Sequence, residues 1–260
     1  MVVAHQDIVQ TIETLSYKAL PALERRYYDG WLIRYANGYT KRANSVNPIY
    51  ESEIDVDRKL DFCESFFTNK QLPVTFKMTD YTQPLDLDDV LAARQYRKIG
   101  ETAVYTMPVF NQSPPQANVQ ITSHLMPQWL NAFMSLNTIH PDHHVTFERM
   151  MELIPQTCSR GYVSLLQDDS VVGVALGVLD EGWLGIFDVF VQPSHRGNGY
   201  GRAVVEALLA WGVLQGAERA YLQVQMDNTI ALQLYRSLGF SEQYRYWYRV
   251  KDLYSGSLDR

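Results

Sequence analysis

The stretch that decides the fold is Val191-Gln192-Pro193-Ser194-His195-Arg196-Gly197-Asn198-Gly199-Tyr200-Gly201-Arg202. It lies between a run typical of a strand, from Trp183 to Val191, and a run typical of a helix, from Arg202 to Gln215. The alternating glycines leave a loop with little side-chain bulk, whose backbone N–H groups can point toward one place. The N-terminus of the following helix adds unpaired N–H groups and partial positive charge. This combination favours phosphate binding, and an ordinary strand-to-helix turn is the alternative.

The sequence that follows the loop decides between these two interpretations. The glycine spacing by itself matches neither the dinucleotide-binding fingerprint nor the P-loop. A short strand is expected from Ala220 to Gln225, then Asp227-Asn228, then a helix that ends in Leu234-Tyr235-Arg236-Ser237-Leu238-Gly239-Phe240. A loop in this setting is more specific than a glycine-rich turn alone.

In this order of features the chain resembles the GNAT N-acetyltransferase superfamily, from about residue 118 to residue 250. The matching positions are Val191 and Pro193 at the strand end, Arg196, Gly199 and Gly201 in the acetyl-CoA loop, Asn228, and Tyr235 with Gly239-Phe240. The resemblance implies an α/β fold with a mixed sheet, and an acyl-CoA-dependent transferase activity.

The composition is that of an ordinary globular protein of 260 residues, with 46% hydrophobic residues and a net charge of −6. This acidity argues against a general nucleic-acid or anionic-membrane surface. Two distant cysteines, Cys63 and Cys158, predict reduced thiols and no disulfide framework. No apolar run is long enough for a membrane span, and the N-terminus lacks the pattern of a signal peptide, so a cytoplasmic location is expected.

Hydrophobic periodicity predicts the elements of each half. In the second half, strands are expected at 119–122, 161–166, 171–179, 183–191, 220–225 and 244–250, and helices at 127–136, 147–154 and 202–215. In the first half, helices are expected at 8–25, 56–68 and 87–96, and strands at 31–35, 40–46, 74–78 and 102–107. Proline-rich residues 108–118 read as a linker.

The two halves follow a similar order. Val46 corresponds to Val191, Val74 to Ala220 and Leu91 to Tyr235, so the offset stays between 144 and 146 residues. Where the second half has its glycine loop, the first has Tyr50 to Asp55, with three acids and no glycine. We therefore expect a degenerate GNAT-like domain at 1–107 that does not bind CoA, a linker at 108–118 and a catalytic domain at 119–260. An unrelated small α+β domain is the alternative for the first half.

The resemblance also assigns the cofactor contacts. Main-chain groups of Val189, Phe190 and Val191 would pair with the pantetheine arm of acetyl-CoA, and the backbone of the loop would hold the pyrophosphate. Asn228 would bind the cofactor arm, or cap the helix that follows it. The expected cofactor-binding residues are Val189, Phe190, Val191, Arg196, Gly197, Asn198, Gly199, Tyr200, Gly201, Arg202 and Asn228.

Two residues are candidates for the proton transfers. By resemblance Tyr235 would protonate the departing thiolate, unless it only packs on the sheet. Asp188 stands in an otherwise apolar strand, where alternation points it away from Val189 and Val191. A buried carboxylate is costly without a partner, so Asp188 is either the base or amine anchor, or a carboxylate bonded to a neighbouring strand or a helix end. Gln223 and Gln225, where a family glutamate is frequent, cannot be bases.

Other residues carry weaker signals. His140, His143 and His144 lie in a segment that reads as a loop, and no metal site is expected. Polar residues in the runs 31–35 and 42–46 would either complete the substrate pocket from the first half or face solvent by simple alternation. One or two aromatic residues among Tyr244, Tyr246, Trp247 and Tyr248 could line the acceptor pocket, with core packing as the other role.

These observations together predict an N-acetyltransferase that moves an acetyl group from acetyl-CoA to a primary amine by direct attack. The alternatives are a non-catalytic acyl-CoA-binding regulatory module and an acyltransferase that uses a longer acyl-CoA. The acceptor is a small-molecule or peptide amine, with no nucleic acid and no membrane as partner. The choice between these acceptors, the acyl preference and the oligomeric state, a homodimer included, are left open by the sequence.

Overall fold

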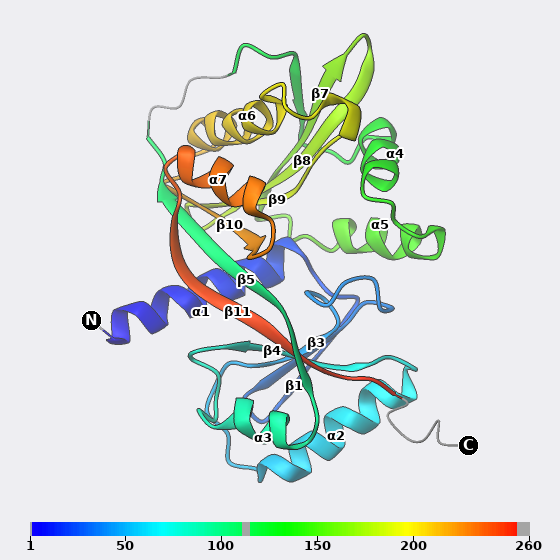
Figure 1. The fold of residues 1–260 in the computed structure, drawn as a ribbon, viewed down its shortest axis with the longest axis vertical. Helices are drawn as coiled ribbons and strands as arrows, with labels where there is room; N and C mark the ends of the chain where they lie inside the picture. Colours follow the sequence, from blue (N-terminus) through cyan, green and yellow to red (C-terminus); the bar gives the residue numbers. More distant parts are fainter. Residues whose placement is uncertain (1, 111–114, 254–260) are drawn as a thin grey trace.

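One mixed sheet of eleven strands runs through the molecule. The computed structural model describes residues 2–110 and 115–253. The strand order is β1-β2-β3-β4-β11-β5-β10-β9-β8-β7-β6, so the last strand in the sequence lies near the middle of the sheet. Figure 1 shows the two halves of the chain at opposite ends of this sheet, with β5 and β11 running between them.

The second half has the layered α/β arrangement that its sequence predicts. Its strands are β6 (Val119–Thr122), β7 (Ser159–Gln167), β8 (Ser170–Asp180), β9 (Trp183–Val191), β10 (Arg219–Gln225) and β11 (Ser241–Lys251). Its helices are α4 (Pro127–Leu136), α5 (His144–Glu152), α6 (Tyr200–Leu214) and α7 (Thr229–Ser237). Strands β6 to β9 are antiparallel neighbours, and β10 lies parallel to β9. This is the fold class expected from the glycine loop and its surroundings.

Helices cover the sheet of the second half on both faces. Trp129 and Phe133 of α4 and Phe147 of α5 are fully buried in one core cluster, which includes Val174 of β8. Val204 and Leu208 of α6 are buried in a second cluster, together with Tyr235 of α7. Burying such side chains supplies the main driving force for this layering, at roughly 25 cal/mol for each Å² of apolar surface.

The first half repeats the same order of elements on a smaller scale. It consists of α1 (Val2–Ala19), β1 (Glu24–Tyr28), β2 (Trp31–Tyr35), β3 (Ser45–Pro48), α2 (Val56–Asn69), β4 (Val74–Thr79), α3 (Leu87–Ala93) and β5 (Arg97–Pro108). Strands β3 and β4 are parallel, and α2 connects them in the sequence. In the same way β9 and β10 are parallel, and α6 connects them. This likeness supports a duplicated unit, and the division into two domains stays a prediction.

The final strand of each half pairs across the centre of the molecule. Strand β5 pairs antiparallel with β10, and β11 pairs antiparallel with β4. The two strands also pair with each other along most of their length, from Ser241↔Thr106 to Val250↔Arg97. Each half therefore completes the sheet of the other half (Figure 1).

Two expectations for the first half are wrong. The helix expected to reach Arg25 ends at Ala19, because Pro21 disfavours the helical conformation of the residue before it. The chain then forms β1, which pairs with β2 through an Asp29-Gly30 turn whose φ angles are 43° and 77°. Such an Asp-Gly pair is a strong hairpin signal that the helical periodicity of residues 8–25 concealed.

The strand expected from Thr40 to Val46 is shorter and begins at Ser45. The preceding residues form turns, with N–H groups of Ala43 and Asn44 bonded to the carbonyls of Thr40 and Lys41. The Asn44 side chain holds this segment by accepting from the N–H groups of Ala36 and Gly38, at 2.8 and 3.0 Å. A side chain that binds local backbone in this way competes with strand formation.

Candidate active site

Strands β9 and β10 separate at the end that carries the glycine loop. Their parallel pairing runs from Trp183 and Arg219 to Ile186 and Leu222 and stops there, although β9 continues to Val191. On its other side β9 stays paired with β8 as far as Val191. The main-chain groups of Val189 and its neighbours that face β10 are therefore available to a ligand inserted in the gap.

A β-bulge at Asp188 ends the regular pairing. Phe187 lies opposite Leu176 of β8, while Phe190 lies opposite Val174, so β9 has one extra residue there. Asp188 adopts a left-handed φ of 52°. The strict alternation expected along β9 is therefore wrong at this point, because a bulge places successive side chains irregularly.

The loop before α6 has the backbone shape that the glycines predict. Gly197 and Gly199 have φ angles of 82° and 76°, which favour glycine, and a Cβ atom at either would meet nothing within 4 Å. Gly199 is the N-cap residue of α6. No side chain of the described residues caps this helix end. The first N–H groups of α6 therefore have no side-chain acceptor among the described residues, which is the condition for an anion site at a helix N-terminus.

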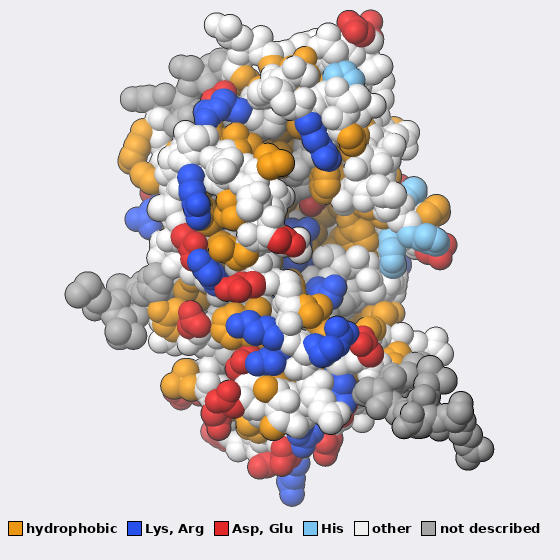
Figure 2. Space-filling view, viewed as in Figure 1, with side chains coloured by type: hydrophobic (Ala, Val, Ile, Leu, Met, Phe, Trp, Pro, Cys, Tyr) orange, Lys and Arg blue, Asp and Glu red, His pale blue; other side chains and the backbone are white. Residues whose placement is uncertain are grey.

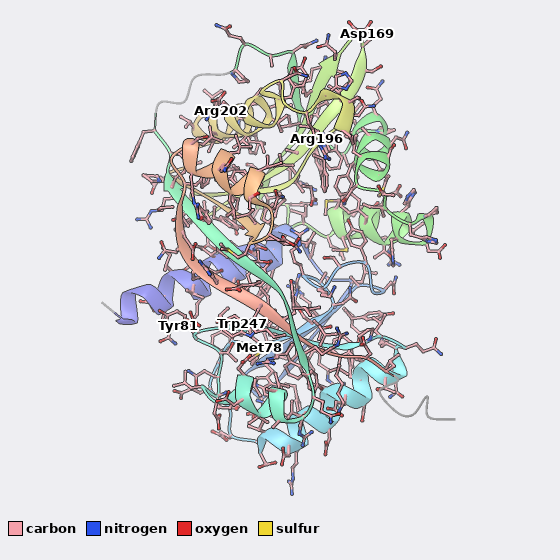
Figure 3. The ribbon with its side chains drawn as sticks, viewed as in Figure 1. Met78, Tyr81, Asp169, Arg196, Arg202 and Trp247 are labelled. Atoms are coloured by element: carbon pink, nitrogen blue, oxygen red, sulfur yellow. The ribbon has the colours of Figure 1, made fainter. Side chains whose placement is uncertain are left out.

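The polar side chains of the loop hold its shape. The Arg196 guanidinium donates to the carbonyl of Val191 at 3.1 Å, and the Asn198 amide donates to the carbonyl of His195. The Tyr200 hydroxyl donates to Gln167. Arg202 lies in the first turn of α6, close to the loop that carries Arg196 (Figure 3). It donates to Glu206 and to Ser237, and the second bond joins α6 to α7. In this loop the main chain is the available phosphate ligand.

The equivalent helix end in the first half is closed. Asp55 is the N-cap of α2, and its carboxylate accepts from the N–H groups of Asp57 and Arg58 at 3.1 and 3.3 Å. These donors correspond to those that remain open at α6. A carboxylate at this place neutralises the anion site from within and repels phosphate.

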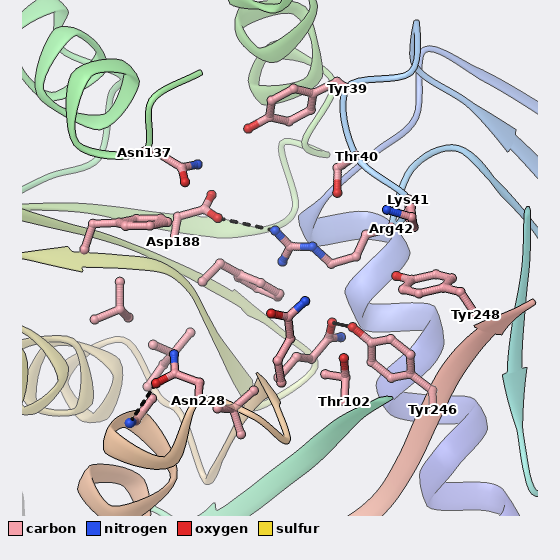
Figure 4. A pocket seen from close by; sticks show the side chains of 18 of the residues that line it. Tyr39, Thr40, Lys41, Arg42, Thr102, Asn137, Asp188, Asn228, Tyr246 and Tyr248 are labelled. Atoms are coloured by element: carbon pink, nitrogen blue, oxygen red, sulfur yellow. Dashed lines mark hydrogen bonds and ion pairs between the residues drawn. The ribbon is translucent and has the colours of Figure 1, made fainter. Parts of the chain in front are cut away.

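A cavity of about 560 Å³ opens beside the gap between β9 and β10. It is lined by Gly38, Tyr39, Thr40, Lys41, Arg42, Thr102, Asn137, Ile186, Phe187, Asp188, Val189, Phe190, Gln223, Val224, Gln225, Asn228, Ala231, Tyr235, Tyr246 and Tyr248. The molecule is hollowed at its middle in Figure 2, with basic side chains visible around the hollow. Figure 4 shows the lining from close by, with residues of both halves facing each other.

Asp188 is the one carboxylate among the residues that line this cavity. Its side chain is 7% exposed, and Oδ1 lies 3.5 Å from Nη2 of Arg42, which is a loose pair. Its Oδ2 atom is buried and has no hydrogen-bond partner among the described residues. Burial raises the pKa of Asp188 above its ordinary value, although Arg42 opposes this shift.

Asn228, at the start of α7, and Tyr235, within it, line the same cavity. Burial raises the pKa of Tyr235 to about 12, so the phenol keeps its proton at neutral pH. Its ring packs edge-on against Phe240, with 6.1 Å between centroids, which fixes its orientation. Asn228 caps α7 by accepting from the N–H of Ala231 at 3.1 Å, so the helix-cap role is filled.

The opposite wall comes from the first half of the chain, in the turn region 38–42. Arg42 reaches across to Asp188, while Tyr39 packs on Phe147 of α5. The sequence points to Arg42 but not to Tyr39, Thr40 or Lys41, because the pattern of residues 40–46 predicts a strand where the structure has turns. The Asn37-Gly38 turn was the available signal, since a turn places the next residues at the surface of a fold.

Strand β11 supplies the remaining wall. Tyr246 and Tyr248 line the cavity, whereas Trp247 points the other way and donates to Asp88. The Tyr246 hydroxyl donates to Gln223 at 3.1 Å, and Gln223 in turn donates to Ser16 of α1. Strand residues 31–34 are buried in the core, so solvent-facing alternation is wrong for them.

The comparisons with known proteins agree with this geometry. The family model described as "Probable histone acetyltransferase Rv0428c C-terminal" matches residues 7–249, nearly the whole chain. The chain belongs to this family. It is 28% identical over 253 residues to the uncharacterized N-acetyltransferase YobR of Bacillus subtilis, covering 94% of this chain and 99% of that protein. It is 25% identical over 238 residues to the probable histone acetyltransferase Rv0428c of Mycobacterium tuberculosis, covering 89% and 70%.

A solved structure shows the same fold over the whole chain. The GCN5-related N-acetyltransferase from Kribbella flavida superposes with a TM-score of 0.68 and covers 95% of this chain and 96% of that one, at 16% identity. With the family match and the similarity to YobR, the chain is a member of the GNAT N-acetyltransferase superfamily, as its glycine loop and Tyr235 indicate. Membership of this family makes it an acyl-CoA-dependent acetyltransferase in general terms.

In this GNAT protein the predicted residues fall into two groups. Asp188, Val189, Phe190, Asn228 and Tyr235 all line the cavity. Val191, at the end of β9, and the loop residues 196–202, at the N-terminus of α6, lie outside the lining. The three histidines lie near η1 (Pro141–His143), and the described residues contain no group of three or more potential metal ligands. No helix within residues 2–110 and 115–253 has the length and apolar character of a membrane span.

Proposed function

We propose that this protein transfers an acetyl group from acetyl-CoA to a primary amine in the cavity between its two halves. The observation that carries the proposal is the shared cavity: a buried carboxylate, a buried phenol and the open edge of β9 face one space. Direct transfer from a thioester needs these three elements, because the two reactants must be held together while one proton is removed and another is supplied.

The chain's residues fit acetyl-CoA at its two ends. The uncapped N–H groups at the start of α6 would bind the pyrophosphate, and glycine at 197 and 199 leaves the approach free of side chains. Backbone groups of Val189, Phe190 and Val191 would pair with the pantetheine arm in the gap, and Asn228 would face it from α7. When bound, the cofactor supplies an activated acetyl group as a thioester.

Asp188 is the proposed base and amine anchor. Its carboxylate lines the cavity and is held there by a loose contact with Arg42, so it can accept a hydrogen bond from the amine. Its raised pKa makes the ionised form a stronger base than an exposed aspartate. The amine nitrogen forms the new C–N bond while the C–S bond breaks, and the proton lost by the amine passes to Asp188. Gln223 and Gln225 in the same cavity have no basic group to compete for this role.

Tyr235 is the proposed partner of the departing sulfur. A phenol with a pKa of about 12 remains protonated and can donate a hydrogen bond to a thiolate. A free thiol has a pKa of about 8.5, so full transfer from Tyr235 would be uphill by about 5 kcal/mol. We therefore infer that Tyr235 stabilises the developing thiolate mainly as a donor, with the proton balance completed by the one released from the amine.

The first half is proposed to be a degenerate copy that supplies one wall of the acceptor site. Two observations support this: the repeated element order around the parallel pair β3 and β4, and the Asp55 carboxylate that closes its phosphate site. Residues 38–42 form its contribution to the cavity.

The test is a panel of primary amines incubated with acetyl-CoA, followed by thiol release and by the mass of the N-acetyl product. Tyr235→Phe is expected to lower kcat by roughly 100- to 1,000-fold, the effect of losing one donor that acts mainly in the transition state. Tyr96→Phe is the matched control, because Tyr96 is buried in the first half, bonds to Glu64 and lies outside the cavity.

Three outcomes separate the proposal from its alternatives. Binding of acetyl-CoA with no thiol release on any amine would favour a regulatory acyl-CoA-binding module. Faster turnover with a longer acyl-CoA would favour another acyltransferase. Full turnover in Tyr235→Phe would remove the assignment of that residue.

A further inference from the structure

The cavity lining has more positively charged than negatively charged side chains. Two cationic side chains, Lys41 and Arg42, face one carboxylate, Asp188. The chain as a whole carries a net charge of −6, so a cationic wall here is contrary to the overall composition. A cavity wall that departs from the overall charge indicates complementarity to a ligand of opposite sign.

Arg42 has hydrogen-bonding capacity that the protein leaves unused. A guanidinium has five N–H donors, and a single bond from Nη2 to Asp188, at 3.5 Å, joins this side chain to the described residues. Burial would lower the pKa of Arg42, but Asp188 and three tyrosines raise it above its ordinary value, so it stays charged. In Figure 4 its guanidinium extends into the space in front of Asp188.

The backbone that carries both cations is fixed. Asn44 binds the N–H groups of Ala36 and Gly38 and donates to the carbonyl of Thr40 at 2.9 Å. The buried guanidinium of Arg34 donates to the carbonyl of Arg42 itself. Arg42 is thus held in place by its main chain while its side chain, 33% exposed, remains free to take a partner. Lys41 forms no ion pair within the described residues.

The phosphates of the cofactor have their own site. The open N–H groups of α6 and the loop 196–202 lie outside the cavity lining, whereas Lys41 and Arg42 belong to the wall contributed by the first half. The two cations therefore face the acceptor side of the cavity, across from Val189 and Asn228.

We propose that the acceptor is a small amine that carries an acidic group, a carboxylate or a phosphate, close to its nitrogen. This inference rests on the proposed function. The acidic group binds Arg42 and Lys41, and the amine lies against the Asp188 carboxylate, which lines the same cavity. The acidic group of such a molecule pairs with Arg42, and its amine pairs with Asp188. Each of the two residues thereby replaces the loose 3.5 Å contact between them with a closer ion pair to the ligand. A lysine-rich peptide meets like charge at this wall.

The experiment compares matched acceptors on the full-length protein. A set of amino acids is tested, each against its own amide, and phosphoethanolamine is tested against ethanolamine. The first comparison measures the effect of a carboxylate, and the second measures the effect of a phosphate. A lysine-rich peptide completes the set. One charged hydrogen bond contributes about 1.5–3 kcal/mol, so kcat/KM for the acidic member of the preferred pair is expected to exceed that of its neutral partner by roughly 10- to 100-fold.

Two variants assign this preference to the proposed residues. In Arg42→Gln and in Lys41→Gln the ratio of acidic to neutral acceptor is expected to fall toward one. The ratio matters more than the rate, because any change that Arg42→Gln makes to Asp188 affects both members of a pair. Arg97→Gln is the control, since it removes an equal charge at an exposed pair with Asp252, outside the cavity.

Preference for a neutral amine or for the lysine-rich peptide would overturn the inference, as would a ratio that neither variant changes. Calorimetric binding of the same acceptors in the presence of CoA separates this inference from the proposed function. An acidic amine that binds without being acetylated, and binds less tightly to Arg42→Gln, supports the acceptor class while the proposed function fails. An absence of both binding and turnover for the acidic amines overturns the acceptor class itself.

Discussion

Asp188 has two features that reduce the stability of the fold. They are a left-handed φ of 52° and a buried oxygen with no partner among the described residues, and the nearby Arg42, 3.5 Å away, offsets the second only in part. A strained backbone and an unsatisfied buried carboxylate each cost of the order of 1–3 kcal/mol. Such costs cluster at functional sites, where strain and incomplete pairing hold a group ready for a ligand.

The raised pKa of Asp188 leads to a prediction about pH. The ionised carboxylate is the active form, so kcat/KM should fall when the pH drops below its folded-state pKa. Because burial raises that pKa, the fall should occur above the ordinary aspartate value of about 3.9. Asp188→Asn should lower kcat/KM by roughly 100- to 10,000-fold and remove this inflection. A pH–rate profile measures both effects.

The same pH–rate profile also tests the effect of Arg42 on Asp188. Arg42 lowers the pKa of Asp188 against the effect of burial, so Arg42→Gln should move the inflection to higher pH. Asp180→Asn serves as a control on the neighbouring strand, because Asp180 pairs with Lys18 and lies outside the cavity. A profile in Asp188→Asn that keeps the wild-type inflection would mean that another group is the base.

At the scale of elements, helix α6 offers two glycines that differ only in their surroundings. Gly199 at its N-cap and Gly216 after its C-terminus both have positive φ, 76° and 93°, and a Cβ atom would meet nothing within 4 Å at either. Gly199→Ala and Gly216→Ala should therefore each cost about 1 kcal/mol of stability through backbone strain. Only Gly199→Ala should weaken CoA binding, by about tenfold or more, because its methyl group lies at the phosphate site. Thermal unfolding and calorimetric titration measure the two quantities. Equal CoA affinity in both variants would contradict the phosphate site.

The elements that the sequence predicts well are those with a strong local signal. Strands β9 and β2 have the expected bounds, and Asn228 begins α7 because a short polar side chain satisfies the first N–H groups. The helix-to-strand change at Pro21 was missed because periodicity outweighed one proline. The cavity wall was missed because the bonds of Asn44 that shape residues 38–42 are a property of the folded chain.

The candidate site shows the same division. Asp188, Asn228 and Tyr235 could be named from residue type and order, since each stands in a motif or breaks an apolar pattern. Their proximity to Tyr39, Lys41 and Arg42 could not be predicted, because it depends on how the two halves pack against each other. The β-bulge at Asp188 also has no local signature in the sequence, since it follows from the register of β8 and β9.

At the scale of the molecule, the two helix ends predict one cofactor per chain. Calorimetric titration with CoA should give a stoichiometry of one, because α6 leaves its first N–H groups open while Asp55 occupies those of α2. Asp55→Ala should cost about 1 kcal/mol of stability as a lost helix cap and leave CoA affinity unchanged. A second binding event in the wild-type protein would contradict the closed site of the first half.

The exchange of the last strands predicts that both halves unfold together. Strand β11 pairs with β4 and β5, and β5 pairs with β10, so neither half can open without breaking pairs that complete the other. A buried ion pair adds to this connection, since Glu13 of α1 binds Lys77 of β4 at 2.5 Å and Tyr244 of β11 at 2.7 Å. Chains of this length commonly unfold in more than one step, so a single transition is informative.

Single-tryptophan variants that keep either Trp31 or Trp129 report on the two halves separately, since these residues are buried in different core clusters. We expect their denaturant midpoints to coincide. Leu60→Ala, a change in the core of the first half, should cost about 2–5 kcal/mol and lower both midpoints equally. If the Trp129 midpoint stays in place while the Trp31 midpoint falls, the halves unfold independently. The acceptor wall at residues 38–42 would then be able to detach from Asp188, which would remove the structural basis for placing the active site between the halves.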